Sequence, residues 1–304
     1  MDSIWSRLQV AAQGSRGGRL LDRIAAATAV LLLLPAGVGA FPADLVKSVE
    51  VIGGAQLGFP IDNFDRLGIR VSWLGDLDGD GRPELAAGAH TDDEPFDSGA
   101  VYVFSLDVDG TVIPGSVVKY AEPTDPLNVL QLGTDDRFGS GFAPLGDFDG
   151  DGNFELIVGS FAGEQAGQPG GSGELWVLDI DPITRALVRG YTIGSATTNL
   201  GPLPGSSTFG GALATLGDWD GDGAPEIGVG AYTDDDGGTD RGAMYIIYLE
   251  PPVSPGDDAQ GVKGFTKISD TSGGLQAPLQ NSARFGNAVE SVGDRNGDGQ
   301  IDVA

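Results

Sequence analysis

Short apolar runs, separated by glycine-rich and acidic segments, make up the hydrophobic pattern of the chain after residue 40. The most apolar runs are rich in β-branched and aromatic residues, and lie at Ala100–Leu106, Glu174–Leu178 and Ala243–Leu249. Such runs are typical of β-strands. After residue 40, no apolar pattern of helical period continues for about 11 residues or more. The pattern therefore predicts an all-β protein.

The runs belong to a unit that occurs four times. Its centre reads GDLDGDGRPELAAGA from Gly75, GDFDGDGNFELIVGS from Gly146, GDWDGDGAPEIGVGA from Gly217 and GDRNGDGQIDVA from Gly293. Eight residues before the first loop aspartate of each unit, a glycine follows an apolar residue, at Leu67-Gly68, Phe138-Gly139, Phe209-Gly210 and Phe285-Gly286. A further glycine lies twelve residues after that aspartate in three units, at Gly88, Gly159 and Gly230. Spacing this constant indicates a structural repeat.

Each unit is predicted to form four strands. The first strands are expected at Ile69–Leu74, Ser140–Leu145, Gly211–Leu216 and Asn287–Val292, and the second at Glu84–Ala89, Glu155–Ser160 and Glu226–Ala231. The third are the three apolar runs, and the fourth are expected at Ser116–Tyr120, Ala186–Thr192 and Gly261–Ile268. The first loop aspartates Asp76, Asp147, Asp218 and Asp294 are 71, 71 and 76 residues apart. Four-stranded units that repeat at this spacing favour the blades of a β-propeller. We place the blades at 64–134, 135–206, 207–281 and, in part, 282–304, within a propeller region of 41–304.

Between the first and second strands lies an acidic loop with the pattern D-x-D/N-x-D-G-x-x-E/D. Alternate residues of a tight loop point the same way, so three side chains, one carbonyl group and a closing acid can converge on one cation. All-oxygen ligands on a flexible loop favour Ca²⁺. We predict one Ca²⁺ per loop, up to four in all. The proposed ligands are Asp76, Asp78, Asp80, Arg82 and Glu84; Asp147, Asp149, Asp151, Asn153 and Glu155; Asp218, Asp220, Asp222, Ala224 and Glu226; and Asp294, Asn296, Asp298, Gln300 and Asp302.

The alternatives to a calcium loop of this kind are a solvated acidic turn and an EF-hand. Solvated turns would leave carboxylates close together at a cost of about 4 kcal/mol per pair 4 Å apart. An EF-hand requires a glutamate at position 12 and flanking helices. Position 12 is Ala87, Val158 or Val229, and strands are predicted on both sides. The second loop position, at Leu77, Phe148 and Trp219, is expected to pack the loop onto its blade.

The phenylalanine-glycine pair, the aspartate loop and the later glycine-alanine together resemble the FG-GAP repeats of the integrin alpha-chain β-propeller and its bacterial relatives. The resemblance covers residues 64–304. It implies an extracellular, calcium-stabilised propeller with ligand-binding loops on one face and calcium on the other. The sequence departs from the family at Leu67, which replaces phenylalanine, and in lacking proline after the second motif.

Charge and composition narrow the range of partners. The chain has 44 acidic and 17 basic residues, a formal net charge of −27, one histidine and no cysteine. Nucleic acid and anionic membranes are excluded as partners by repulsion. The absence of cysteine excludes disulfides and thiolate metal sites.

The first 40 residues have the layout of a secretory signal peptide. Four arginines precede the apolar run Ile24–Leu34, and small residues end at Ala40. The run is shorter than the roughly 20 residues of a membrane span. Cleavage after Ala40 and export are expected, with no membrane insertion afterwards; a retained anchor is the alternative. The chain ends inside its fourth unit, which predicts a fragment of a longer propeller, with Val46–Ile52 as a candidate strand for the last blade.

Partners are expected on the face opposite the aspartate loops, where the connections are longest. These are His90–Ser98, Phe161–Ser172 and Tyr232–Arg241 within blades, and Ala121–Arg137, Gly194–Thr208 and Asp270–Arg284 between them. The acidic runs at Asp92 and Asp234 are expected to be solvated, with further cation binding as the alternative, and His90 is expected to be a bystander.

The sequence predicts a secreted, calcium-binding interaction or adhesion module without catalytic residues. Its ligand would be an extracellular protein or polysaccharide. The alternatives are a substrate-holding region of a larger secreted hydrolase or lyase, and a structural component of a surface layer or matrix.

Overall fold

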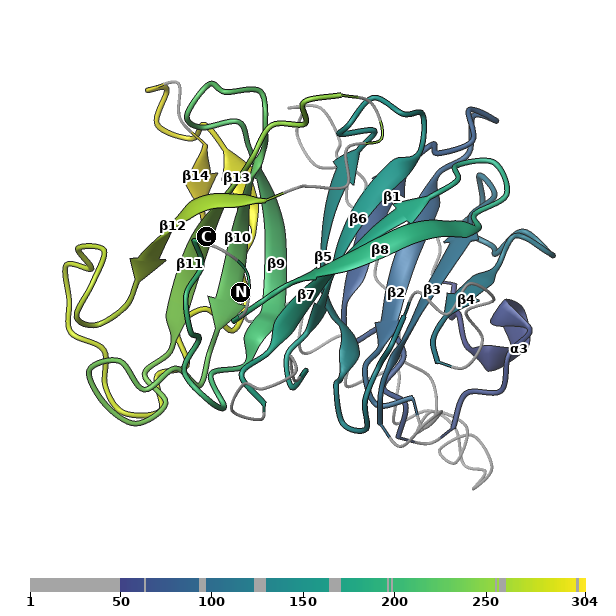
Figure 1. Ribbon diagram of the computed structural model, residues 1–304. Helices are drawn as coiled ribbons and strands as arrows, with labels where there is room; N and C mark the ends of the chain where they lie inside the picture. Colours follow the sequence, from purple (N-terminus) through teal and green to yellow (C-terminus); the bar gives the residue numbers. More distant parts are fainter. Residues whose placement is uncertain are drawn as a thin grey trace, which may run out of the picture.

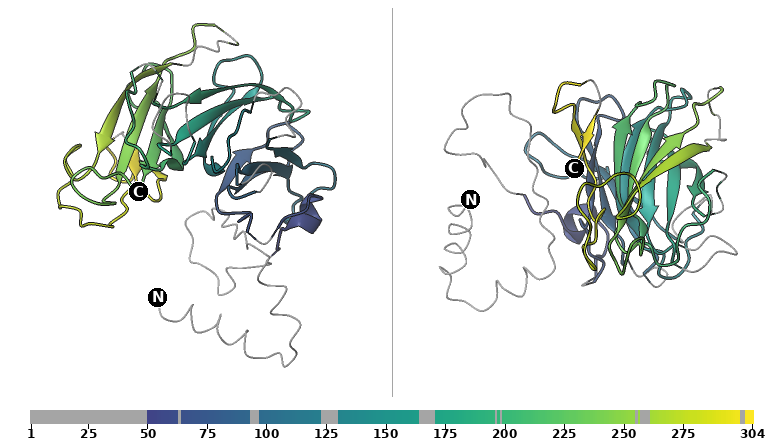
Figure 2. Two further views of the ribbon diagram at one scale, coloured as in Figure 1. Left: turned by 60° about the horizontal axis from the view of Figure 1, so that its bottom comes forward. Right: turned by 90° about the vertical axis from the view of Figure 1, so that its left-hand side faces the viewer.

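Three antiparallel sheets of four strands follow one another around an arc, with a two-stranded sheet after the third (Figures 1 and 2). This computed structural model describes residues 50–304 except 63, 93–96, 123–129, 164–170, 196, 198, 255, 257–260 and 299–300. Within each sheet the strands lie in chain order, so each repeat forms one up-and-down blade. The predicted all-β propeller, with three full blades and part of a fourth, is confirmed.

The strands lie close to their predicted positions. The first blade contains β1 (Val71–Gly75), β2 (Glu84–Ala89), β3 (Ala100–Ser105) and β4 (Val118–Tyr120); the second contains β5 (Phe138–Gly146), β6 (Phe154–Ser160), β7 (Glu174–Ile180) and β8 (Leu187–Ile193). The third contains β9 (Phe209–Gly217), β10 (Glu226–Ala231), β11 (Ala243–Leu249) and β12 (Val262–Ile268), and β13 (Ser291–Gly293) pairs with β14 (Asp302–Val303) in the fourth unit. Among the residues that the structure describes, the one helix is α3 (Gly54–Leu57), a single turn.

The core lies between blades rather than within one sheet. Leu74 and Val101 of the first blade pack with Leu156 and Trp176 of the second, and a matching cluster joins the second blade to the third. All residues of β2, β3, β6, β7 and β10 are buried. This explains their continuous apolar runs, because the middle strands of a blade are covered on both faces, whereas strands with one solvated face alternate.

The repeated glycines lie where neighbouring blades touch. A Cβ atom on Gly88, Gly159 or Gly230 would lie 2.0, 2.0 or 1.9 Å from the carbonyl oxygen of the next unit's early glycine, at Gly139, Gly210 or Gly286. The two glycines of the repeat therefore form one contact, between the second strand of one blade and the start of the next unit, in β5, β9 or the segment before β13. Any side chain would separate the blades there.

The segment before the first repeat covers the outer face of the first blade. Ile52 and Leu57 are buried in one cluster with Leu67, Leu85 and Tyr102 of the first repeat. Residues 46–49 of the expected closing strand lie outside the described residues, and Glu50–Ile52 are not in a strand. The described part thus packs on the first blade rather than completing the last. The expected signal peptide, at residues 1–40, also lies outside the described residues.

Candidate metal centres

The aspartate loops connect the first and second strands of each blade and are tightened by their own carboxylates. Asp76 Oδ2 accepts a hydrogen bond from the Gly81 amide at 2.9 Å, and Asp78 Oδ1 accepts one from the Asp80 amide at 3.2 Å. Gly81 has a φ of 87°, a conformation that favours glycine. The second and third loops repeat this arrangement. The first three loops therefore share one local structure.

The closing glutamate of each loop is buried at the start of the second strand. Glu84, Glu155 and Glu226 are at most 1% exposed. Their Oε2 atoms accept hydrogen bonds from the backbone amides of the second loop residues: 2.7 Å from Leu77, 2.7 Å from Phe148, and a short one from Trp219. The Leu77, Phe148 and Trp219 side chains pack against the blade cores, as predicted. The second residue thus holds each loop in two ways: its amide donates to the closing glutamate, and its side chain packs on the blade core.

The structure brings together only part of each predicted ligand set. Carboxylate oxygens that lie within 4.8 Å of one another belong to Asp76, Asp78 and Glu84 in the first loop, Asp147, Asp149 and Glu155 in the second, and Asp218, Asp220 and Asp222 in the third. Asp80 lies outside the first group, and the closing Glu226 lies outside the third. The roles assigned to the carbonyl groups of Arg82, Asn153 and Ala224 stay predictions.

The fourth loop is related to the others but carries no such group among its described residues. Asp302 Oδ2 accepts a hydrogen bond from the Arg295 amide at 2.8 Å, which is the role of Oε2 in the closing glutamates. Its Oδ1 accepts one from the Asn296 side chain at 3.4 Å. Asp294 Oδ1 accepts hydrogen bonds from the amides of Gly297 and Asp298. Gln300 lies outside the described residues.

One carboxylate at the second loop was not predicted from the sequence. Asp179, near the end of β7, pairs across the ladder with Glu155 and forms a second group with Glu155 and Asp151. The corresponding partners of Glu84 and Glu226 are Ser105 and Tyr248. Only strand register places this position beside the loop, so a search restricted to the loop motif misses it.

Two closing glutamates have an oxygen without a partner. Among the described residues, no hydrogen-bond donor reaches Oε1 of Glu155 or Oε1 of Glu226, although both atoms are buried. Burial, with the charges of Asp149 and Asp179, raises the pKa of Glu155 to about 8. Burial also raises the pKa of Glu226, together with the neighbouring Asp220, Asp218 and Asp222. Both sites are therefore electrostatically unfavourable for carboxylates unless a cation is close by.

Basic side chains already reach each of the first three loops. Arg185 bonds to Asp78 at 3.0 Å and Glu84 at 3.1 Å in the first. Arg189 pairs with Asp151 at 2.7 Å in the second, and Lys263 pairs with Asp220 at 2.6 Å in the third.

The second and third loops fit a hard divalent cation. They offer three or more carboxylates and a buried, unpartnered glutamate oxygen beside them, which is the all-oxygen donor set that Ca²⁺ prefers. When bound, such an ion supplies positive charge and coordination to these oxygens.

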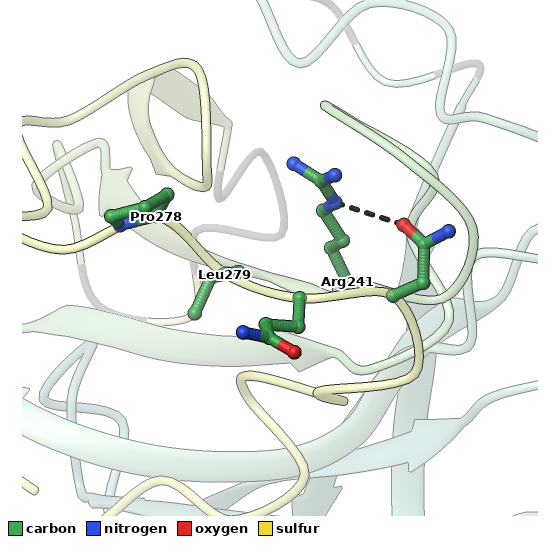
Figure 3. A pocket seen from close by; sticks show the side chains of 5 residues that line it. Arg241, Pro278 and Leu279 are labelled. Atoms are coloured by element: carbon green, nitrogen blue, oxygen red, sulfur yellow. Dashed lines mark hydrogen bonds between the residues drawn. The ribbon is translucent and has the colours of Figure 1, made fainter.

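The described residues of the opposite face form a second candidate surface. A shallow pocket lies between the β10–β11 connection and the connection that leads to the fourth unit (Figure 3). Its lining is Arg241, Pro278, Leu279, Gln280 and Asn281. Arg241 Nε donates to Asn281 Oδ1 at 3.1 Å, and the same guanidinium pairs with Asp270. The pocket thus combines the guanidinium of Arg241 with an apolar edge formed by Pro278 and Leu279.

His90 is not an isolated loop residue. It is buried, and the centre of its ring lies 5.5 Å from the centre of the Phe161 ring. The centre of the Phe161 ring lies 6.4 Å from that of Tyr232. These three residues each follow the glycine-alanine or glycine-serine pair of their repeat. Aromatic rings at one repeat position therefore join the three blades, a regularity that aligned repeats could have indicated.

Comparison with known proteins agrees with the repeat geometry. The family described as FG-GAP repeat matches residues 68–104. These residues run from the early glycine of the first unit through its aspartate loop to β3. The chain carries an FG-GAP repeat.

Integrin chains are among the relatives. Integrin alpha-IIb of Homo sapiens is 32% identical over 165 residues, and integrin alpha-IIb of Mus musculus is 31% identical over 163 residues. Each alignment covers 52% of this chain and 14% of the integrin. The resemblance to an integrin-like FG-GAP repeat protein, expected from the motifs, is confirmed. No helix in the described part of the chain is long and apolar enough to cross a membrane.

Proposed function

We propose that this chain is a secreted, calcium-binding β-propeller that serves as an adhesion or protein-interaction module rather than an enzyme. Ca²⁺ binds in the aspartate loops and stiffens the first hairpin of each blade that holds it. An extracellular protein or polysaccharide binds on the opposite face. Export is supported by the signal-like layout of residues 1–40.

The observation that carries the metal assignment is the unpartnered oxygen of each closing glutamate in the second and third loops. Glu155 and Glu226 are 1% and 0% exposed, and neither Oε1 meets a donor among the described residues. Buried charges in proteins are normally paired or bind metal. A divalent cation bound between the loop aspartates and Oε1 of the closing glutamate would give that oxygen a partner in each of the two loops.

The binding role is supported by a difference between the two faces: the repeated carboxylates lie on one face, and the pocket lies on the other. The carboxylates at fixed repeat spacing lie in the loops between first and second strands. The pocket at Arg241 lies among the connections at the other ends of the strands. Loops held by a rigid scaffold are frequent binding sites, so a ligand there leaves the metal loops free for their structural role.

The metal assignment is tested by thermal unfolding in Ca²⁺ and in chelator. A ligand present at 100 times its Kd stabilises the folded state by about 2.7 kcal/mol per site. We expect the midpoint to fall by several degrees in chelator. The double variant Glu155→Gln, Glu226→Gln should lose most of this difference.

Glu174→Gln is the matched control, because Glu174 is also a buried glutamate at the start of a strand but belongs to no carboxylate group formed by the described residues. It should keep the full response to Ca²⁺. Equal midpoints of the wild-type protein in Ca²⁺ and chelator would refute the metal assignment.

The interaction role is tested by immobilising the protein over an array of soluble polysaccharides and purified extracellular matrix proteins. Binding should weaken in Arg241→Ala and persist in Lys263→Ala, which removes a cation from the calcium face. Equal loss in both variants would contradict the proposed binding face.

A further inference from the structure

Arg185 distinguishes the first aspartate loop from the other two. It lies in the turn between β7 and β8 of the second blade, yet its side chain enters the loop of the first blade. Its Nη2 atom lies 3.0 Å from Asp78 Oδ2, 3.1 Å from Glu84 Oε1 and 2.6 Å from Ser105 Oγ, and these three acceptors share its two N–H groups. One guanidinium therefore contacts two of the three carboxylates grouped in that loop.

Arg185 contacts Oε1 of Glu84, and this is the glutamate atom that lacks a partner among the described residues in the second and third loops. In all three loops the Oε2 atom of the closing glutamate accepts the amide of the second loop residue. The Oε1 atom of Glu84 receives Arg185, whereas in the described residues the Oε1 atoms of Glu155 and Glu226 receive no donor. The same atom of the repeat is thus neutralised by a side chain in one blade and left for another cation in two.

The basic residues at the second and third loops do not play this role. Arg189 pairs with Asp151 and Asp179 and lies 3.8 Å from Asp149, and Lys263 pairs with Asp220 and Asp222. Each therefore contacts grouped carboxylates as Arg185 does, but among the described residues neither reaches Oε1 of its closing glutamate. Their side chains are 31% and 46% exposed, against 10% for Arg185. They are more exposed than Arg185, so their displacement by a bound ion would cost less.

Arg185 is fixed in place by further contacts with the first blade. Its Nη1 atom donates to the Ser116 carbonyl oxygen at 3.0 Å, and its own carbonyl oxygen accepts the Tyr120 hydroxyl at 2.7 Å. Arg185 has a φ of 57°, and its amide donates to the Asp181 carbonyl oxygen at 2.8 Å, which shapes the turn. Removing the guanidinium from the loop would leave a buried charge without its partners.

The residue opposite the closing glutamate makes room for this arrangement. Ser105 pairs with Glu84 in the ladder and bonds to the guanidinium, whereas Asp179 and Tyr248 take this position in the other two blades. The small hydroxyl side chain leaves space for a side chain from the neighbouring blade.

We infer that the guanidinium of Arg185 takes the place of a bound cation in the first aspartate loop. The second and third loops bind Ca²⁺, and the first does not. A divalent ion beside this guanidinium would meet strong like-charge repulsion in a buried site. Arg185 thereby ties the first blade to the second without metal. The inference rests on the proposed calcium binding, but it makes a separate prediction about where the ions bind.

The test counts the Ca²⁺ ions bound to the full chain by native mass spectrometry and calorimetric titration. Three matched variants change the first aspartate of each loop to asparagine: Asp76→Asn, Asp147→Asn and Asp218→Asn. All three aspartates are exposed, and one oxygen of each accepts the amide of Gly81, Gly152 or Gly223, a role that the asparagine oxygen can take over. Asp218 also accepts the Gly221 and Asp222 amides through its other oxygen, so Asp218→Asn loses hydrogen bonds in the loop that the other two variants keep. We expect Asp147→Asn and Asp218→Asn each to bind one ion fewer than wild type, and Asp76→Asn to bind the wild-type number.

Loss of one ion in Asp76→Asn would overturn the inference while leaving the proposed function intact. A wild-type chain that binds no Ca²⁺ would instead refute the proposed function, and the inference with it. Arg185→Gln gives a second test, because it empties the first loop of its guanidinium. A folded Arg185→Gln protein should bind one ion more than wild type, and an unchanged count would contradict the replacement.

Discussion

The hydroxyl of Tyr245 donates a hydrogen bond of 3.0 Å to Asp234, an aspartate that is only 1% exposed. The other carboxylate oxygen of Asp234 receives Lys267 Nζ, also at 3.0 Å. That ammonium group lies 5.5 Å from the centre of the Tyr245 ring. The three residues come from the β10–β11 connection, β11 and β12. They therefore tie a connection on the face opposite the aspartate loops to the two outer strands of its blade.

The first blade repeats this network. Tyr102 donates to Asp92 at 3.1 Å, and Lys119 Nζ lies 3.0 Å from the other oxygen of that carboxylate. In the second blade, Gly163 and Trp176 occupy the positions of the aspartate and the tyrosine. The expectation that the acidic runs at Asp92 and Asp234 are solvated is wrong for these two residues. Each is buried because a lysine from the fourth strand neutralises it.

Asp234→Ala should destabilise the protein strongly. Removing one partner of a buried ion pair costs about 3–5 kcal/mol. Here the Tyr245 hydroxyl loses its acceptor and Lys267 keeps only Asp236, at 3.4 Å, so we expect the lower end of that range. Asp235→Ala, at the exposed neighbouring position, loses only the hydrogen bond that Oδ1 accepts from the Asp240 amide and should change the free energy of unfolding by about 1 kcal/mol or less. Denaturant titration measures both. Similar values for the two variants would mean that the network contributes little to stability.

The strands and the loops could be predicted from the sequence because their signals are local. Runs such as Ala243–Leu249 are apolar throughout, and the structure has β11 with those bounds. The loop motif keeps fixed spacing, so its carboxylates and closing glutamates can be assigned residue by residue. Local chemistry over ten or so residues determines these features.

The basic side chains that contact the loops could not be predicted in this way. Arg185 is 107 residues from Asp78, and Lys263 is 43 residues from Asp220. Asp179 reaches the second loop only through the register of β6 and β7. These contacts depend on how strands and blades pack, and no spacing along the chain expresses that packing.

Gly159→Ala tests the glycine contact between blades. A Cβ atom there would lie 2.0 Å from the Gly210 carbonyl oxygen, so the second and third blades must separate. We expect a loss of about 3 kcal/mol or more, as for overpacked cores, and a lower midpoint of thermal unfolding. Gly264→Ala is the control, because no atom lies within 4 Å of its added Cβ. That variant should be neutral or slightly stabilising in its strand. A tolerated Gly159→Ala would show that the blades can shift apart without cost.

His90→Phe should make the protein less sensitive to acid. Burial, with the nearby charges of Arg66, Arg137 and Arg70, lowers the pKa of His90 to about 4. The unfolded chain, with a pKa near 6.5, takes up a proton first, so stability is lost as the pH falls from about 6.5 to 4. At pH 5 this loss amounts to about 2 kcal/mol.

Phenylalanine is the residue at the equivalent position of the second blade, Phe161. It removes Nδ1, which has no partner among the described residues, and the 3.5 Å contact between Nε2 and Arg66 Nη1. Because the chain has one histidine, no other imidazole contributes to this pH range. Denaturant titrations at pH 5 and pH 7.5 should give a smaller difference in the variant than in wild type. An equal difference would show that His90 is protonated in the folded state.

Glu174→Gln should change the pH dependence in the opposite direction. Burial, reinforced by the charge of Asp136, raises the pKa of Glu174 to about 7, although Trp176 Nε1 donates to it at 3.2 Å. The unfolded carboxyl ionises near pH 4.5, before the folded one. This group therefore lowers the free energy of unfolding as the pH rises from about 4.5 to 7, by an amount on the order of 3 kcal/mol.

Glutamine keeps the acceptor for Trp176 but carries no charge, so the variant should match wild type near pH 4 and exceed its stability near pH 8. Glu250→Gln, at an exposed position, should follow the wild-type curve throughout. Urea titrations across this range, all in chelator, isolate the effect as the difference between the curves. Parallel curves for Glu174→Gln and wild type would place a charged Glu174 in the folded blade at neutral pH, with a cation or water near it.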